Sequence, residues 1–394
     1  MKRIFYGMRS RLKSLLADIG ALAIIMGAIV LIVRFAPSNE VPATQRQAAH
    51  SAAVEAAIPI QESHSDTTTA EEKKPSESVG APSTPPKKPE KQEQKGDSVE
   101  RVREPYRSPP LAFAAVNDAT RAALVNILCI PQGKSLSPIS GSGVIIDPRG
   151  VILTNAHVAQ YVLLSESTQI DLACTIRTGA PAAARYLASV LYLPSVWVEK
   201  HAPELRDAHP LGSGEHDYAL LLIDAMADGN PLPENTGAFP YLSPDTREAI
   251  AFQDDQVLVA SYPAEFLGGY AATSGLYPAS SVTNIGKLLT FSEKSVDLVS
   301  LGGVIEAQSG SSGGAVSNAW DRLVGLITTT SEGETTGARD LRAITLSYID
   351  RDLKAQTGSG LGAMLGGDVV SKEQDFRTSA APDLLRAFIA VLAR

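Results

Sequence analysis

The stretch SGSGVIIDPRGVILTNAHV at residues 140–158 predicts two short strands and the turn that joins them. Val and Ile dominate residues 143–146 and 151–154, and the turn-forming letters DPRG stand between these runs. The second run leads into TNAHV, which places His157 just beyond the end of a strand. An imidazole there is a candidate general base, although a histidine beside a strand is more often structural.

Short β-type runs continue outward from this stretch, separated by Gly, Pro, Ser and Asp, and they predict an all-β sandwich or barrel. We predict strands at residues 124–130, 143–146, 151–154, 170–176, 218–223, 256–260, 296–301, 314–316, 323–328 and 341–345. The remaining predictions are a helical or irregular insertion at 194–208, a connection between two halves at 224–246 and a helix at 348–356.

Two further motifs can carry chemistry, EHDYALLLI at residues 215–223 and GSSGGAV at residues 310–316. Peptide hydrolysis by serine needs an activated alcohol, a base, a carboxylate that orients the base, and N–H groups that face the developing oxyanion. Ser312, His157 and Asp217 supply the side chains in this set. Each residue alone has an ordinary explanation, because GSSGG suits a flexible turn and an Asp is common where a strand starts.

Taken together, the three motifs resemble the chymotrypsin-like serine proteases, and most of all the bacterial HtrA/Deg type, over about residues 111–356. The chain order His, Asp, Ser is the one expected of this family. The resemblance implies two six-stranded antiparallel β-barrels, at about 111–230 and 250–357, with the active site between them. It also implies that His157 is the general base and then the general acid, that Asp217 orients its imidazole, and that Ser312 is the nucleophile.

The same match assigns the remaining site residues. The N–H groups of Gly310 and Ser312 would form the oxyanion hole. Glu306, Thr328 and Thr330 would contact substrate, with Glu306 at the floor of the primary specificity pocket. A carboxylate there favours a basic residue before the scissile bond. Two alternatives stay open: Glu306 faces solvent, or the enzyme shares the preference of HtrA-type relatives for small aliphatic residues.

Two neighbouring positions refine the match. His216 directly precedes Asp217 and is a second candidate base, but on a strand its side chain would point away from that of Asp217. Ser311 stands where trypsin-type zymogens carry the Asp that pairs with a newly cut N-terminus, and no IVGG-like activation sequence is present. Both features favour the Deg-type pattern and argue against activation by N-terminal trimming.

Composition excludes several other functions. The formal net charge of −8 provides no basic surface for nucleic acid, and two cysteines cannot build a thiolate metal site. We therefore expect neither a metal nor another cofactor. Cys129 and Cys174 lie on the first and fourth predicted strands, which are neighbours in the first barrel of this family, so the resemblance implies a disulfide. Two buried free thiols are the alternative.

The first 110 residues predict a membrane attachment. A basic segment at residues 1–14 precedes an apolar run at 15–34 that is long enough to cross a bilayer, which predicts a cytoplasmic N-terminus. Val41 and Ala43 offer a signal-peptide cleavage site as the alternative, although they lie well beyond the apolar run. Residues 35–110 are rich in Pro, Ser, Lys and Glu, and they predict a disordered linker.

The C-terminal 37 residues, 358–394, predict a Gly-rich segment and a short helix at 382–393. This segment is too small for the PDZ domain that HtrA-type enzymes usually carry, and we expect it to dock on the barrels. The leading hypothesis is a serine endopeptidase that is anchored in the inner or plasma membrane. It would act outside the cytoplasm, in the periplasm or extracellular space, on exported or misfolded polypeptides through an acyl-enzyme.

The alternative is a catalytically inactive protease fold that binds peptides, and a structural membrane tether is a weaker third reading. The sequence does not decide between surveillance of misfolded chains and processing of a defined target, nor does it fix an oligomeric state.

Overall fold

The structure is a computed structural model that describes residues 101–393, except for 103–104, 134–135, 207–212, 268–272, 292–294, 332 and 334. The predicted cytoplasmic segment 1–14, the predicted membrane helix 15–34 and residues 35–100 of the predicted linker lie outside the described residues. Among the helices that are described, none has the length and apolarity needed to cross a membrane.

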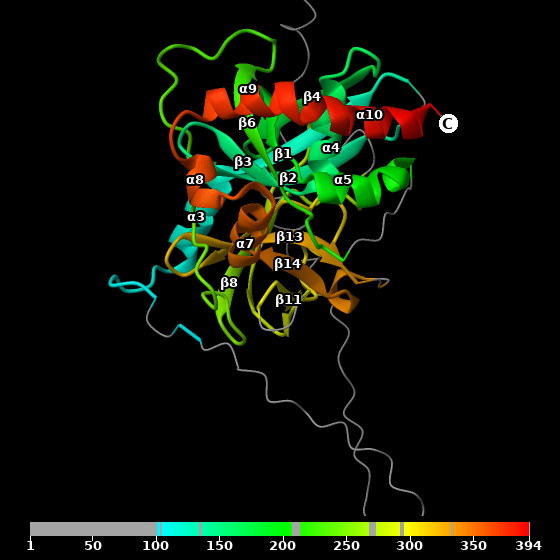
Figure 1. Cartoon of the computed structure of the whole chain (residues 1–394). Coiled ribbons are helices and arrows are strands. Elements are labelled where there is room, and N and C mark those ends of the chain that lie inside the picture. The colour runs from blue at the N-terminus through cyan, green and yellow to red at the C-terminus, as the bar shows by residue number, and fades with distance from the viewer. Residues whose placement is uncertain are drawn as a thin grey trace, which may run out of the picture. The chain divides into compact units, whose positions relative to one another are not determined.

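Six antiparallel strands close into a first barrel with the order β1-β2-β3-β6-β5-β4, in the upper half of Figure 1. The strands are β1 (Leu124–Pro131), β2 (Ile139–Asp147), β3 (Val151–Thr154), β4 (Leu172–Thr178), β5 (Ala183–Tyr192) and β6 (Ala219–Met226). The predicted six-stranded first barrel is therefore confirmed. Strand β5 was not predicted because its N-terminal half is Ala-rich and largely exposed, which hides the apolar alternation of a strand.

The second half is an open, curled sheet, and the prediction of a second closed six-stranded barrel is wrong in this respect. Its order is β10-β11-β14-β13-β12-β8-β9, and β7 pairs with β13 beside this path. The strands are β7 (Ser243–Pro244), β8 (Gln256–Ser261), β9 (Ala279–Asn284), β10 (Leu288–Leu289), β11 (Leu298–Gly302), β12 (Ala315–Asn318), β13 (Arg322–Thr330) and β14 (Leu341–Thr345). The terminal strand β10 is only two residues long, so it cannot extend a ladder to β9.

Helices surround the two sheets and exceed in number the two helices that we predicted, at 348–356 and 382–393. They are α3 (Phe113–Ala123), α4 (Ala156–Ser165), α5 (Ser195–His201), η1 (Ala202–Arg206), η2 (Thr336–Ala338), α7 (Leu346–Thr357), α8 (Leu361–Leu365), α9 (Val369–Ser379) and α10 (Ala381–Leu392). The predicted helices at 348–356 and 382–393 correspond to α7 and α10. Helix α9 was missed because its sequence is mostly polar, with little apolar periodicity.

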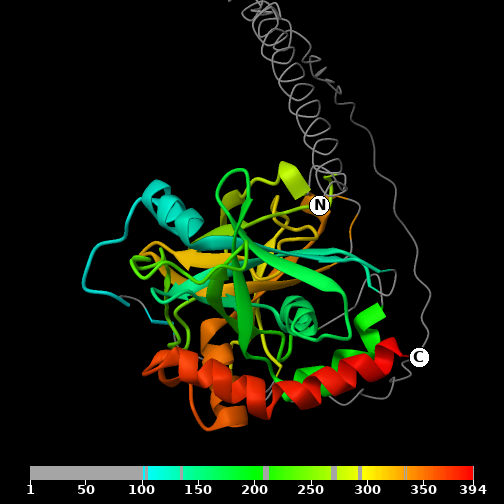
Figure 2. The same cartoon turned by 90° about the horizontal axis from the view of Figure 1, so that it is seen from above.

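The C-terminal helices pack on the first barrel, as expected for this segment. Helix α9 contacts β5 and β6, and α10 contacts α4, α5 and η1. Phe376, Leu384 and Phe388 are buried and join the apolar core of the first barrel. Figure 2 shows α9 and α10 following one another along one side of the molecule. This packing makes residues 369–392 part of the folded domain.

Residues 105–110, within the predicted linker, contact the second half of the molecule. The ring of Tyr106 lies 5.2 Å from that of Trp320, and the indole Nε1 of Trp320 donates to Ser108 O at 2.8 Å. The guanidinium of Arg247 also lies over the Tyr106 ring, with its Cζ 5.0 Å from the ring centroid. Tyr106 is the only aromatic residue of this stretch, and one aromatic residue was too sparse a signal to predict this docking.

A shared apolar core fixes the two halves relative to each other. Leu153 of β3 and Tyr218 next to β6 pack in one buried cluster with Leu326 of β13 and Ile344 of β14. Each side chain is at most 1% exposed. Because close-packed interiors resist displacement, the loops that meet above this core are held at fixed separations.

Candidate active site

Strand register brings His157 and Asp217 together. Strand β3 pairs with β6 so that Thr154 lies opposite Ala219, which places the residues after β3 beside the residues before β6. Helix α4 starts at Ala156, and its N-cap residue Asn155 donates from Nδ2 to Asp217 O at 2.8 Å. The predicted juxtaposition of base and carboxylate is therefore a result of backbone pairing within the first barrel.

The two side chains form a two-point contact. His157 Nδ1 lies 2.8 Å from Asp217 Oδ2 and 3.0 Å from Oδ1, and the His157 backbone N–H donates to Oδ1 at 3.1 Å. From the second sheet, Thr328 Oγ1 donates to Asp217 Oδ2 at 2.7 Å. The Asp217 side chain is 8% exposed and that of His157 is 29% exposed, so the imidazole keeps a solvent-facing edge. Its second nitrogen, Nε2, is free of this carboxylate.

The electrostatics of the pair suit a general base. Burial raises the pKa of Asp217, but the charge and hydrogen bonds of His157 and the hydroxyl of Thr328 outweigh burial, so the carboxyl pKa is lowered overall. Burial lowers the pKa of His157, but the charge and hydrogen bond of Asp217 reverse this effect and raise it. An imidazole with a raised pKa accepts a proton more readily once it is neutral.

Ser312 lies in the turn before β12, and backbone contacts fix this turn against the first barrel. The Ser142 N–H donates to Ser312 O at 2.7 Å, and the Gly313 N–H donates to Ile327 O at 2.9 Å. Gly313 has φ of +85°, and a Cβ there would lie 2.0 Å from Ser142 O. Only glycine fits this approach, as expected for a chain that passes close behind a nucleophile.

One dipeptide, Ile327–Thr328, links the elements of the site. Its Ile327 carbonyl holds the turn of Ser312, while the hydroxyl of Thr328 holds Asp217. Across the described residues, no hydrogen bond joins the Ser312 hydroxyl to His157. Contacts of this kind are often long before substrate binds. The structure thus brings the three predicted triad residues to one junction between the two halves.

The two predicted oxyanion groups are available. Within the described part of the chain, the N–H groups of Gly310 and Ser312 have no hydrogen-bond partner. Gly310 has φ of +94°, and a Cβ there would lie 2.7 Å from Tyr262 O, so the turn requires glycine. The Ser142 hydroxyl donates to Gly310 O at 2.8 Å and holds the following peptide. Sequence reasoning missed Ser142, although it stands in the quoted SGSG run.

Ser311 is held by a neutral partner. The Ser261 hydroxyl donates to the Ser311 hydroxyl at 2.8 Å, and both side chains are at most 1% exposed. The turn before Ser312 is therefore held by a neutral hydrogen bond from Ser261 of β8 to Ser311, and not by an ion pair at Ser311. Ser261 could not be found from sequence, because it lies 50 residues before its partner.

The structure gives burial or hydrogen-bond partners for two of the three predicted specificity residues. Glu306 is fully buried, and its Oε1 accepts from the Ser281 hydroxyl of β9 at 3.1 Å. Burial raises the pKa of Glu306 to about 7. The hydroxyl of Thr328, assigned to substrate binding, is occupied by Asp217. Thr330 ends β13, but its side chain lies outside the described structure.

His216 is bound elsewhere. It occupies a turn with φ of +59° rather than a strand, so the alternation argument used against it was wrong. Its Nδ1 lies 2.9 Å from Asp352 Oδ2 on α7, and its backbone N–H donates to the Tyr348 hydroxyl at 2.9 Å. Its partner is thus Asp352 of α7, whereas Asp217 pairs with His157.

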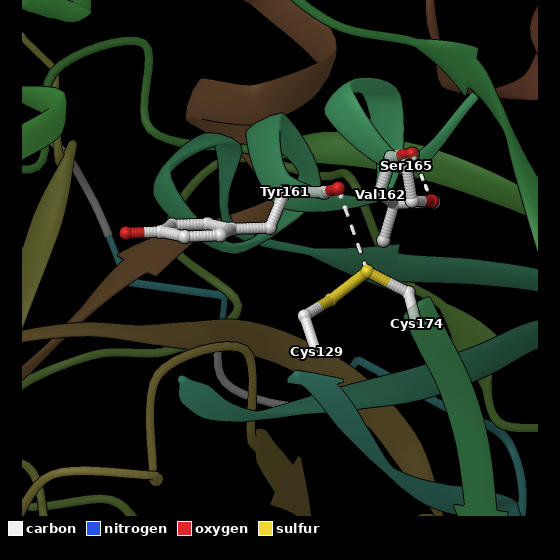
Figure 3. Close-up of a disulfide and its surroundings, with 5 residues drawn as sticks. All are labelled: Cys129, Tyr161, Val162, Ser165 and Cys174. Carbon is white, nitrogen blue, oxygen red and sulfur yellow. Dashed lines mark hydrogen bonds between the residues drawn. A yellow bond between two sulfur atoms is a disulfide. The ribbon is translucent and has the colours of Figure 1, made fainter. Parts of the chain in front are cut away.

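Cys129 and Cys174 face each other on β1 and β4 and form a disulfide in the structure (Figure 3). The Cys174 sulfur also lies 3.4 Å from the carbonyl of Tyr161 on α4. Among the described residues, no hydrogen bond joins either cysteine to His157, Asp217 or Ser312. The described residues contain no group of His, Cys, Asp and Glu that could hold a metal ion.

Comparison with known families agrees with this geometry. Residues 141–326 match the family described as trypsin-like peptidase domain. The matched segment contains His157, Asp217 and Ser312, and it runs from β2 into β13. No curated protein matches the chain.

Proposed function

We propose that this chain, whose residues 141–326 match the family described as trypsin-like peptidase domain, is a membrane-anchored serine endopeptidase of that family. The observation that carries the proposal is the two-point contact of Asp217 with His157 at 2.8 and 3.0 Å, beside the turn of Ser312. A buried carboxylate in this arrangement fixes the imidazole tautomer and stabilises the imidazolium that forms during reaction.

In the proposed mechanism, the Ser312 hydroxyl attacks the scissile carbonyl and His157 Nε2 takes its proton. The oxyanion of the tetrahedral intermediate accepts hydrogen bonds from the N–H groups of Gly310 and Ser312. His157 then gives the proton to the leaving amine, which produces an acyl-enzyme that water hydrolyses by the same steps. Asp217 stays ionised throughout, consistent with its lowered pKa.

An extended polypeptide is the substrate that the site favours. Strand β13 pairs with β14 as far as Thr330, whereas its pairing with β12 ends at Leu326. Residues 328–330 therefore have a free edge on one side in the described structure, next to Asp217. A peptide can add to such an edge as another strand. We propose unfolded or extended segments of exported proteins as the substrates.

The membrane anchor and the extracytoplasmic location form part of the proposal. They rest on the apolar run at 15–34 and on the basic residues before it. Mass spectrometry of protein extracted from membranes tests this point, because an intact anchor retains residues 1–34. A mature N-terminus at or near Thr44 would contradict the anchor.

The decisive experiment is labelling of the full-length protein, purified in detergent, with a fluorophosphonate probe. We expect modification of Ser312 in the wild type and none in Ser312→Ala. Folded wild-type protein that neither reacts nor cleaves casein would favour the inactive peptide-binding alternative. A shorter soluble version should span residues 101–393, because Tyr106 and Phe388 are packed parts of the domain.

A further inference from the structure

Residues 262–267 after β8 and residues 335–340 before β14 both contact the loop 303–314, which contains Ser312. Glu265 of the first segment and Arg339 of the second form a two-point ion pair. Arg339 Nη1 lies 2.7 Å from Glu265 Oε2, and Nη2 lies 2.8 Å from Oε1. The side chains are 14% and 28% exposed, for Arg339 and Glu265 respectively.

Both members of this ion pair form hydrogen bonds with residues 307–309 of the loop before β12. Arg339 Nη1 also donates to Ala307 O at 2.8 Å, and its Nε donates to Gly333 O at 3.0 Å. On the opposite side, the Ser309 N–H donates to Glu265 Oε2 at 3.0 Å. Hydrogen bonds to charged groups are about twice as strong as neutral ones, so residues 307–309 are held at both ends.

These contacts orient one particular peptide group. The Ser309 carbonyl accepts from the Ala264 N–H at 2.8 Å. In a trans peptide the C=O and the following N–H point in opposite directions. A Ser309 carbonyl turned toward Ala264 therefore turns the Gly310 N–H away from that loop. This N–H is one of the two unpartnered groups that the proposed mechanism assigns to the oxyanion.

We propose that Glu265 and Arg339 are positioning residues that set the orientation of the Gly310 N–H for oxyanion binding, an inference that rests on the proposed function. They act through the backbone of residues 307–309 and touch no reacting atom. If the pair is broken, the 309–310 peptide can rotate and direct its carbonyl, rather than its N–H, toward the oxyanion. Loss of one such donor typically costs 10²–10³-fold in kcat.

Two neighbouring contacts explain why the orientation of the turn before Ser312 depends on the Glu265–Arg339 pair. Ser311 and Ser261 form a neutral bond, which supplies no charge to hold the turn. The loop before β12 and the loop between β13 and β14 touch through their backbones, since a Cβ on Gly303 would lie 2.3 Å from Gly337 O. Arg339 therefore reaches the turn from a loop that is packed against it.

The test compares full-length wild type, Glu265→Ala, Arg339→Met and Glu265→Gln on a chromogenic peptide substrate. We expect kcat to fall about 10²-fold in Glu265→Ala and Arg339→Met, with KM nearly unchanged. Glu265→Gln keeps an acceptor for the Ser309 N–H and should recover part of this loss. Arg342→Met is the matched control, because Arg342 pairs with Asp340 on the same strand end.

Amide hydrogen exchange across residues 303–314 gives a readout that is independent of catalysis. We expect at least tenfold faster exchange in Glu265→Ala and Arg339→Met than in wild type or Arg342→Met. Unchanged exchange, or faster exchange with unchanged kcat, overturns the positioning role. A wild type that is inert toward substrate and fluorophosphonate overturns the proposed function instead, and exchange still decides whether the pair holds the loop.

Discussion

The first barrel holds His157 and Asp217 through strand pairing, whereas Ser312 and Gly310 lie in a loop of the second sheet that is held by contacts with β2 and with neighbouring loops. In the first barrel, the β3–β6 ladder sets the separation of the two side chains. In the second sheet, the turn before β12 depends on side chains that reach it from distant loops, as Glu265 does. Backbone ladders bring residues together, but they do not orient a peptide group in a loop.

The two halves also differ in how they are closed. The first barrel is complete, carries the Cys129–Cys174 disulfide and is covered by α9 and α10. The second sheet stays open at β9 and β10. We therefore expect loss of the disulfide to affect mainly stability, and loss of the Glu265–Arg339 contacts to affect mainly the rate of the chemical step.

The largest effect should come from substitutions that remove a triad residue from either half. We expect Ser312→Ala to abolish cleavage and Asp217→Asn to lower kcat by roughly 10⁴-fold, because an amide favours the wrong imidazole tautomer. His157→Ala should be as inactive as Ser312→Ala, since triad members act as a unit. Steady-state kinetics on one peptide substrate measures all three. Substantial residual activity in Ser312→Ala would show that another group attacks.

The sequence predicted the barrel half better than the loop half, and the reason is physical. Local apolar patterning specifies strands, so β3 was predicted at its observed residues 151–154. Motif order predicted a triad of His157, Asp217 and Ser312, and the structure places the His157–Asp217 pair and the turn of Ser312 at one junction. The contacts of Thr328, Ser261 and Glu265 depend on long-range packing, which leaves no local pattern. Glu306 shows the same limit, because its burial was invisible from its neighbours in sequence.

The second effect concerns the disulfide, which sharpens the contrast between scaffold and loops. Cys129 and Cys174 close a loop with a sequence separation of 45 residues. We expect the double substitution Cys129→Ala and Cys174→Ala to lower the free energy of unfolding by about 4 kcal/mol. Because neither cysteine hydrogen-bonds to a triad residue in the described part of the chain, kcat should change little. Urea denaturation without reductant measures the loss, and two alkylatable thiols in unfolded, unreduced protein would contradict the bridge.

A third, smaller effect should come from Glu306 in the second sheet. Its pKa is raised from 4.5 to about 7, so the folded protein holds an extra proton between these values. The stability from this group is present below pH 4.5 and is lost as the pH rises through 7. Glu306→Gln does not titrate, so its stability advantage should grow with pH, by up to about 3 kcal/mol above pH 7.

Urea denaturation at pH 5 and pH 8.5 tests this expectation, with the exposed Glu234→Gln as the matched control. An advantage of Glu306→Gln that is equal at the two pH values would exclude a buried titrating carboxyl. Selectivity before the scissile bond should also be unchanged in Glu306→Gln, since the carboxylate has no exposed surface for a substrate side chain. A loss of preference for basic residues would restore the specificity role.

The smallest effect concerns the pH dependence of kcat/KM, which should report His157 and not His216. His157 must be neutral to accept the proton of Ser312, and the net effect of Asp217 raises its pKa. The acid limb of kcat/KM should therefore have its midpoint above the ordinary histidine value of about 6.5, with activity rising as pH increases.

The pKa of His216 is raised as well, mainly by its hydrogen bond to Asp352. Since this bond leads to α7 and not to Asp217, His216→Gln should leave the midpoint of the limb in place. A pH profile of wild type and His216→Gln measures both points, and a midpoint that moves with His216 would mean that the limb reports the α7 contact instead of the base.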